Sequence, residues 1–102
     1  MNQVVLRSLE DLSEALSISL EHGGAIVTEQ NLSPDFFNLR TGFAGELLQK
    51  FVNYRARLAI VLPDTTAHGE RFAELVYEHR RHPAVRFFAN VHDAQEWLRP
   101  QA

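Results

Sequence analysis

The stretch Arg57-Leu58-Ala59-Ile60-Val61-Leu62-Pro63-Asp64 decides the fold of this chain. Residues 58–62 are all apolar, without the alternation of a half-exposed strand, and the Pro-Asp pair closes the run at a turn. A short continuous run of this kind is typical of a strand buried on both faces, as in parallel sheets covered by helices. We therefore expect residues 58–62 to be the central strand of an α/β sheet.

Strand patterns and helix patterns alternate along the rest of the chain. Further β-branched and apolar runs stand at residues 4–6, 25–28 and 85–89. A Ser8–Asp11 capping pattern opens a helix that ends at Gly23-Gly24. A short turn at 34–39, a main helix at 43–54, a third helix at 68–81 and a last helix opened by Asn90 complete the series.

This alternation predicts a single α/β domain over residues 1–102. The connections are too short to be hairpins between neighbouring strands, so right-handed crossovers and parallel pairing follow. We expect a four-stranded, mainly parallel sheet with helices on both faces, in the element order βαβαβαβα. By analogy with folds of this kind, the expected strand order is 2-1-3-4.

Composition excludes several classes of function. The chain has no cysteine, which excludes disulfides, thiolate catalysis and Cys-ligated metal sites. A net charge of −3 gives nucleic acid no general attraction to the protein. No apolar run reaches the length of a membrane helix, and residues 1–6 lack the pattern of a secretory signal. We expect a cytoplasmic protein that does not contact membranes.

The segment from Asn31 to Arg55, NLSPDFFNLRTGFAGELLQKFVNYR, carries a family resemblance. Together with the LAIV of residues 58–61 it resembles a bacterial family of domains of unknown function, whose members share the motif PDFF(N/D)LxTGxAGExLQKFxNYR. The resemblance covers most of the chain and implies no activity. Members usually place a β-hairpin ahead of the strand at residues 4–6, so we expect a sheet edge that is open or paired with another subunit.

A looser resemblance is to the STAS domains of anti-sigma-factor antagonists. In that family a phosphorylatable Ser or Thr precedes a glycine and an apolar residue at the start of a helix. Thr41-Gly42-Phe43 has a similar place here, although Arg40 replaces the usual acid. The resemblance implies that Thr41 is a candidate switch, because phosphate at a helix start is an anion where anions bind well. The alternative is an ordinary capping hydroxyl.

Polar residues at the carboxyl ends of the predicted strands form a candidate ligand edge. Open α/β sheets bind ligands at this edge, and the residues there suit turns and helix caps equally well. The candidates are Glu29, Asn31, Asp64 and Thr66. If this edge binds a ligand, the protein is a small-molecule or nucleotide-binding domain or a small enzyme.

Two further groups of residues suggest sites that we do not expect to be used. His79 and His82 have helical spacing, but no third ligand stands at a recognisable distance, so neither a metal nor another cofactor is expected. Five arginines could form a nucleic-acid surface: Arg55, Arg57, Arg80, Arg81 and Arg86. Glutamates at 70, 74 and 78 are spaced to pair with arginines of their own helix, which favours a mixed-charge surface instead.

These observations predict a non-catalytic module that acts by contacting another protein or a second copy of itself as a homodimer. Aromatic rings are the natural anchors of such a contact, and the pair Phe36-Phe37 precedes a kink where both rings are hard to bury together. The expected contact residues are Phe36, Phe37, Phe43 and Phe51. No catalytic residue is predicted.

Overall fold

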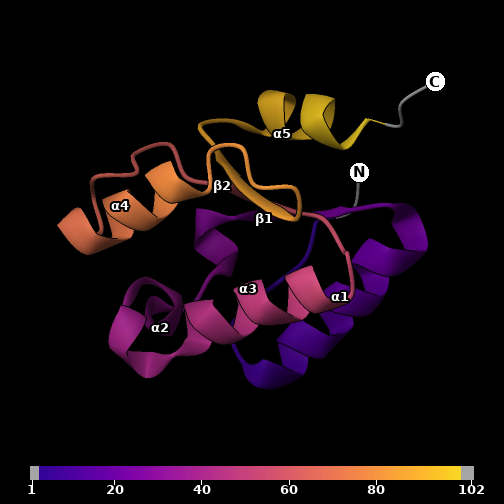
Figure 1. The fold of residues 1–102 in the computed structure, drawn as a ribbon, viewed down its shortest axis with the longest axis horizontal. Coiled ribbons are helices and arrows are strands. Elements are labelled where there is room, and N and C mark those ends of the chain that lie inside the picture. The colour runs from indigo at the N-terminus through magenta and orange to yellow at the C-terminus, as the bar shows by residue number, and fades with distance from the viewer. Residues whose placement is uncertain (1–2, 100–102) are drawn as a thin grey trace.

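Three parallel strands form the sheet in residues 3–99, the part of the chain that the computed structural model describes. The strands are β1 (Ala25–Thr28), β2 (Leu58–Val61) and β3 (Val85–Phe88), in the order β1-β2-β3. The α-helices are α1 (Leu9–His22), α2 (Pro34–Phe37), α3 (Phe43–Asn53), α4 (Glu70–Glu78) and α5 (Val91–Leu98). The short 3-10 helices η1 (Glu29–Asn31) and η2 (Leu39–Thr41) flank α2. The α/β class is therefore confirmed (Figure 1).

The central strand is where the sequence predicted it. Pairing is parallel on both sides, with Leu58 opposite Ala25 in β1 and Val85 in β3. The side chains of β2 are at most 5% exposed, and Leu62 just beyond the strand is fully buried. A strand buried to this extent must be covered front and back.

The prediction of a fourth strand at residues 4–6 is wrong. The segment runs beside β1 but makes only two isolated parallel bridges, Gln3 with Ile26 and Leu6 with Leu32. Between these bridges the β1 chain leaves its extended path at Glu29 and winds into η1. Because the partner backbone turns away, a continuous ladder cannot form.

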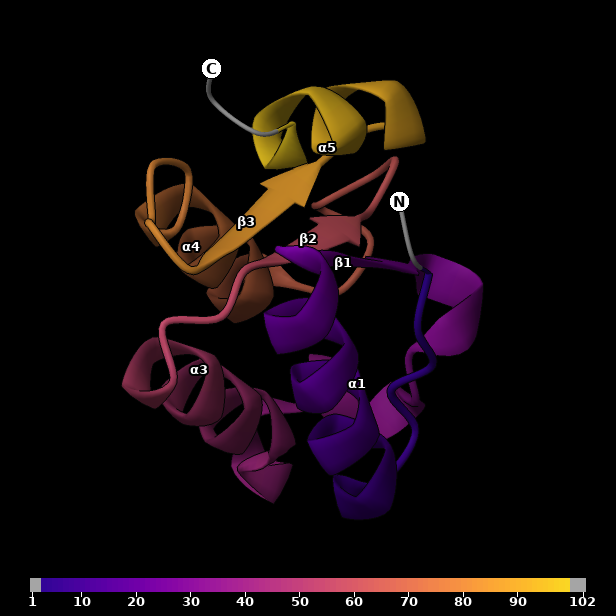
Figure 2. The same ribbon diagram turned by 90° about the vertical axis from the view of Figure 1, so that its right-hand side faces the viewer.

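The predicted strand order 2-1-3-4, in which residues 4–6 count as strand 1, is also wrong. The N-terminal segment lies outside β1, and β1 pairs directly with β2. Each crossover thus advances the sheet by one position in the same direction, which places successive helices on one face when the crossovers share one hand. Among the elements of residues 3–99, helices α1, α3 and α4 cover that face and α5 alone covers the other (Figures 1 and 2).

Two hydrophobic clusters follow from this arrangement. The larger cluster lies between the sheet and α1, α3 and α4, and includes Leu12, Leu47, Phe51, Ile60 and Phe72. The smaller cluster lies under α5 and joins Ile26, Ala59 and Val61 to Ala94 and Leu98. Alternate side chains of one strand point to opposite faces, which is why Ala59 and Ile60 belong to different clusters.

Most helix ends follow their local sequence signals. Ser8 Oγ accepts a hydrogen bond from the Asp11 amide, and Asn90 Oδ1 accepts one from Asp93. Helix α4 is shorter than the predicted 68–81, because the chain before it forms a turn and α4 begins only after Gly69, which has a φ of 96°. None of the helices in the described range could span a bilayer.

Candidate functional site

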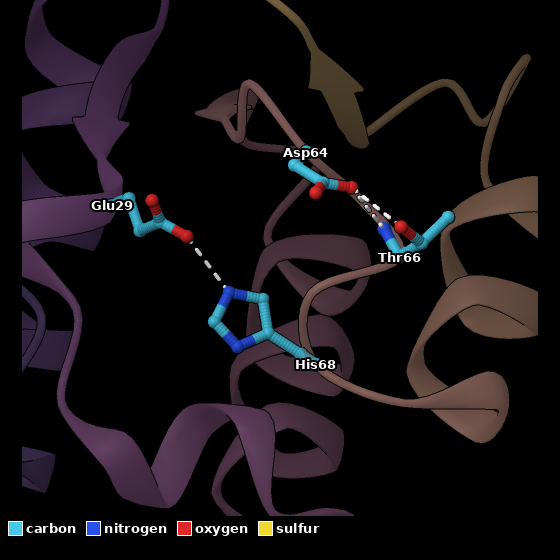
Figure 3. A network of polar contacts seen from close by, with 4 residues as sticks. All are labelled: Glu29, Asp64, Thr66 and His68. Atoms are coloured by element: carbon cyan, nitrogen blue, oxygen red, sulfur yellow. Dashed lines mark hydrogen bonds and ion pairs between the residues drawn. The ribbon is translucent and has the colours of Figure 1, made fainter.

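The carboxyl edge of the sheet holds a small network of polar side chains. Glu29 follows β1, and Asp64 and His68 follow β2. His68 Nε2 lies 2.8 Å from Glu29 Oε2, and Figure 3 shows this pair beside the Asp64–Thr66 contact. The His68 side chain is 21% exposed and the Glu29 side chain 39%. The contact ties the end of β1 to the loop that follows β2.

Asp64 shapes that loop. Its Oδ1 accepts hydrogen bonds from the Thr66 hydroxyl at 2.6 Å and from the Thr66 amide at 2.9 Å. These two bonds, the hydroxyl's first, lower the pKa of the fully exposed Asp64 carboxyl below its ordinary value of 3.8. The positive charge of His68 lowers this pKa further. The loop therefore holds a carboxylate on the same side of the sheet as the imidazole.

The structure divides the predicted ligand edge into parts. Glu29 meets His68, and Asp64 meets Thr66. Asn31 instead donates its side-chain amide to Thr28 Oγ1 at 3.5 Å, within its own turn. The four predicted residues thus lie at one edge without forming one cluster.

His68 is the residue that sequence reasoning missed. Its ring stacks on Phe37 with 3.6 Å between ring centres and 11° between the planes, and Phe37 meets Phe72 edge-on. The imidazole therefore has a carboxylate at its edge and an aromatic ring on its face. The available signal was its position four residues after Asp64, in the turn that follows the most buried strand.

Two hollows flank the segment of residues 34–41, which we call the α2–η2 ridge. One hollow of about 420 Å³ is lined by Phe37, Leu39, Arg40, His68 and Arg71 among others. The other, of about 370 Å³, is lined by Arg7, Leu9, Asp35, Thr41 and Glu46 among others. The ridge is thus exposed on two sides.

Thr41 links the ridge to α3. Its hydroxyl lies 2.7 Å from the Asp35 carbonyl and 2.9 Å from the Asn38 carbonyl, either of which can accept its proton, and it accepts a bond from the Phe43 amide at 3.2 Å. These bonds make it a local capping group at the surface. A phosphate on this oxygen would break these bonds. The geometry is therefore compatible with both interpretations that the sequence left open, a phosphorylated switch and an ordinary capping hydroxyl.

The structure places three of the four predicted contact rings in the core. Phe36 is 1% exposed, Phe43 8% and Phe51 fully buried. Phe36 avoids exposure by packing edge-on against Phe37, Phe43 and Phe72. Only Phe37 keeps part of its ring accessible, so a contact surface in this region must be built mainly from the neighbouring residues of the ridge.

No cluster of three His, Asp or Glu side chains suited to a metal occurs in the described part of the chain. His79 and His82 do approach each other, with ring centres 4.8 Å apart. Both lie beyond α4, which ends at Glu78 and not at the predicted residue 81.

Comparison with family models identifies the chain. Residues 1–98 match the family described as Domain of unknown function (DUF4180). The chain belongs to this family. Comparison of this DUF4180 domain with curated proteins and with solved structures gave no match. The expectation of an uncharacterised domain family is confirmed, whereas the detailed motif and the STAS resemblance stay predictions, and the function must be argued from geometry.

Proposed function

We propose that this DUF4180 domain is a non-catalytic protein-interaction module that pairs with a second copy of itself through the α2–η2 ridge. One observation carries the proposal: the ridge presents the cation Arg40 to one hollow and the acid Asp35 to the other. Glu46 of α3 adds a second carboxylate to the Asp35 hollow, which Arg7 also lines, and Glu70 lines the Arg40 hollow. A two-fold contact needs a surface that is complementary to itself, which this arrangement provides.

Apolar side chains beside the ridge support the same surface. Leu39 is 37% exposed and lines the Arg40 hollow, while Leu9 is 62% exposed and lines the Glu46 hollow. Burying two exposed leucines per copy supplies the apolar component that charge pairs alone do not, since exposed ion pairs contribute little net free energy.

The polar network at the sheet edge supports a non-catalytic role. A His–carboxylate pair activates a side-chain nucleophile only when a hydroxyl or thiol lies within hydrogen-bond distance of the second imidazole nitrogen. Within residues 3–99 the hydroxyl nearest in sequence, Thr66 Oγ1, is engaged with Asp64. The Glu29–His68 contact then serves to hold the β2–α4 loop against the end of β1, and the stacking of His68 on Phe37 holds it against the ridge.

Light scattering over a concentration series tests the pairing. We expect a mass that rises from 11.6 kDa toward twice that value. Leu39→Asp should keep the protein monomeric, whereas Leu20→Asp, at an exposed leucine of α1 away from the ridge, should not. A monomeric mass at every concentration, or equal behaviour of the two variants, contradicts the proposal.

A charge exchange locates the contact. Arg40→Glu should weaken pairing by placing like charges across the interface, and the double variant Arg40→Glu with Glu46→Arg should restore it. Failure of the double variant to restore pairing, with both proteins folded by circular dichroism, would show that these side chains do not face each other.

We further propose that Thr41 regulates this contact. A phosphate there would place about −1.5 to −2 charges beside Asp35 and Glu46 and remove the bonds that join the ridge to α3. Thr41→Glu should therefore weaken pairing more than Thr41→Val, which loses the hydroxyl but adds no charge. Equal masses for the two variants would leave Thr41 a structural cap.

A second candidate function rests on the hollow beside His68. Its imidazole and the Phe37 ring could hold a planar ligand such as a nucleotide base, with Arg40 and Arg71 near a phosphate. Adenosine monophosphate should then raise the unfolding temperature of the wild type and of His92→Ala, but not of His68→Ala. If the unfolding temperature of none of the three proteins rises, the hollow does not bind adenosine monophosphate and this second function is contradicted.

A further inference from the structure

A second edge of the sheet carries a groove that the proposed function does not use. Arg55 and Arg57 precede β2, and His82 precedes β3. The two loops lie side by side because Leu58 donates a backbone hydrogen bond to the Ala84 carbonyl at 2.8 Å. Between them is a hollow of about 370 Å³, the amino-edge groove, lined by Val52, Arg55, Ala56, Arg57, His82, Pro83 and Ala84.

Part of this groove is apolar and accessible. Val52 is 45% exposed at the end of α3, where a valine has no partner in the core. Pro83 is exposed on the facing loop, and Ala56 and Ala84 are buried beneath. These side chains offer a ligand an apolar wall on each side.

The arginines around the groove have no carboxylate partner in the part of the chain that the structure describes. None of the ion pairs formed within residues 3–99 involves Arg55, Arg57 or Arg86. Arg57 instead donates to the Trp97 carbonyl and lies over the Trp97 ring, 4.4 Å from its centre. Arg86 donates to the His82 carbonyl at 2.7 Å. These cations are held in place by neutral groups, which leaves their charge uncompensated.

The expected neutralisation by α4 does not occur in this part of the chain. Helix α4 ends at Glu78, so Arg80 and Arg81 lie beyond it and the i, i+4 geometry does not reach them. Arg80 donates to the Tyr77 carbonyl at 2.9 Å and covers the Tyr77 ring. The ion pairs expected between the glutamates of α4 and these arginines are therefore absent within residues 3–99.

His82 adds a neutral donor to the groove. Its Nδ1 accepts the backbone amides of Ala84 at 3.0 Å and Val85 at 3.1 Å, which requires an unprotonated Nδ1. Partial burial, and then the charges of His79 and Arg86, lower the pKa of His82 below its ordinary value of 6.5. The nitrogen left for a ligand is Nε2, which carries the proton and can only donate.

Arg55 has a backbone conformation that favours glycine. Its φ is 55°, just after the end of α3, where the Ala56 amide turns back to the Phe51 carbonyl at 2.9 Å. Glycine is the usual residue at such a position because a β-carbon is strained there. A long cationic side chain at a position that disfavours it is consistent with use of that side chain in the groove.

We propose that the amino-edge groove binds a small organic anion with an apolar body. Its charged group would accept hydrogen bonds from Arg55, Arg57 and His82 Nε2, and its body would lie against Val52 and Pro83. The size of the groove is at the lower end for small-molecule sites, which favours a small ligand over a polymer. The net charge of −3 also opposes a long polyanion. This proposal is independent of the ridge.

Amide chemical shifts of the ¹⁵N-labelled protein test the groove with four probes. Phenyl phosphate and benzoate carry both an anion and an apolar ring, inorganic phosphate carries only the anion, and benzyl alcohol only the ring. At least one aromatic anion should produce saturable shifts at Ala56, Arg57 and Ala84, and it should bind more tightly than inorganic phosphate and benzyl alcohol. Which one binds identifies the charged group, and absence of saturable shifts with both overturns the proposal.

Arg55→Gly is the decisive variant, because it removes the cation while relieving the backbone. It should raise the dissociation constant of the aromatic anion by about tenfold or more, which is the scale of a lost charge-assisted hydrogen bond. The protein should stay folded. Arg99→Gln, at an exposed arginine just after α5, should bind as the wild type. Unchanged affinity in Arg55→Gly overturns the proposal. So does tighter binding of oligouridylate than of either aromatic anion, which would assign the basic edge to nucleic acid.

Discussion

A β-carbon built on Gly24 would lie 2.6 Å from Cδ2 of Leu98. Gly24 stands just before β1, and Leu98 is the last residue of α5, the only helix on its face of the sheet among the described elements. The absence of a side chain at residue 24 is what allows α5 to approach β1 this closely. The smaller hydrophobic cluster, which includes Leu98, depends on that approach.

Gly24→Ala should lower the free energy of unfolding by about 1–3 kcal/mol, since an added methyl group must displace Leu98 and alanine must adopt a φ of 150°. Urea denaturation measures the change. Gly23→Ala is the matched control: it also has a positive φ, of 80°, but its added methyl meets nothing within 4 Å. If the two variants lose equal stability, the contact with Leu98 is unimportant.

Arg55→Gly should raise the free energy of unfolding by about 0.5–1 kcal/mol, because glycine adopts the left-handed conformation at residue 55 without strain. The gain is smaller than the strain itself, since glycine also adds entropy to the unfolded chain. Arg55→Ala retains the β-carbon and should bring no gain. A stabilised alanine variant would trace the effect to the removed charge and not to the backbone.

Local signals predicted the parts of the fold that depend on neighbours in sequence. The burial of residues 58–62 follows from their apolar run, and the caps at Ser8 and Asn90 follow from residue types three apart. The strand order did not follow, because it depends on which segments pair across long stretches of chain. Residues 4–6 looked like a strand, and only the turn of the partner at Glu29 prevents the ladder.

The two polar edges show the same limit. Glu29 and His68 are 39 residues apart in the chain, so no spacing rule could join them. Arg80 and Arg81 were visible in the sequence, but their pairing with glutamates of α4 was predicted from a helix three residues longer than the real one at its carboxyl end. An error at a helix end thus predicted ion pairs that do not form.

Thr66→Val should raise the pKa of Asp64 toward its ordinary value, because the Thr66 hydroxyl is the main group that lowers it. The recovery is partial, since the amide of residue 66 still donates to the carboxylate. A carboxyl whose pKa is lower in the folded than in the unfolded chain stabilises the fold at pH values above the unfolded-state pKa. This contribution is lost as the pH falls through the folded-state pKa. Carbon-detected NMR titration of the Asp64 carboxyl reports the shift directly. Thr65→Val is the control. If it shifts the pKa of Asp64 as much as Thr66→Val does, the Thr66 hydroxyl is not the cause.

The His82 imidazole should make stability fall in mild acid. Its folded-state pKa is lowered, so the unfolded chain takes up the proton first, and the free energy of unfolding declines as pH drops from about 6.5 to the folded-state value. His82→Asn supplies an oxygen that can accept the Ala84 and Val85 amides but does not titrate. Urea denaturation at a series of pH values should show a weaker decline for His82→Asn than for the wild type. His92→Asn, on the exposed side of α5, should follow the wild type. Parallel curves for wild type and His82→Asn would mean that folding leaves the pKa of His82 unchanged, and would contradict the effect of its burial and of the neighbouring His79 and Arg86.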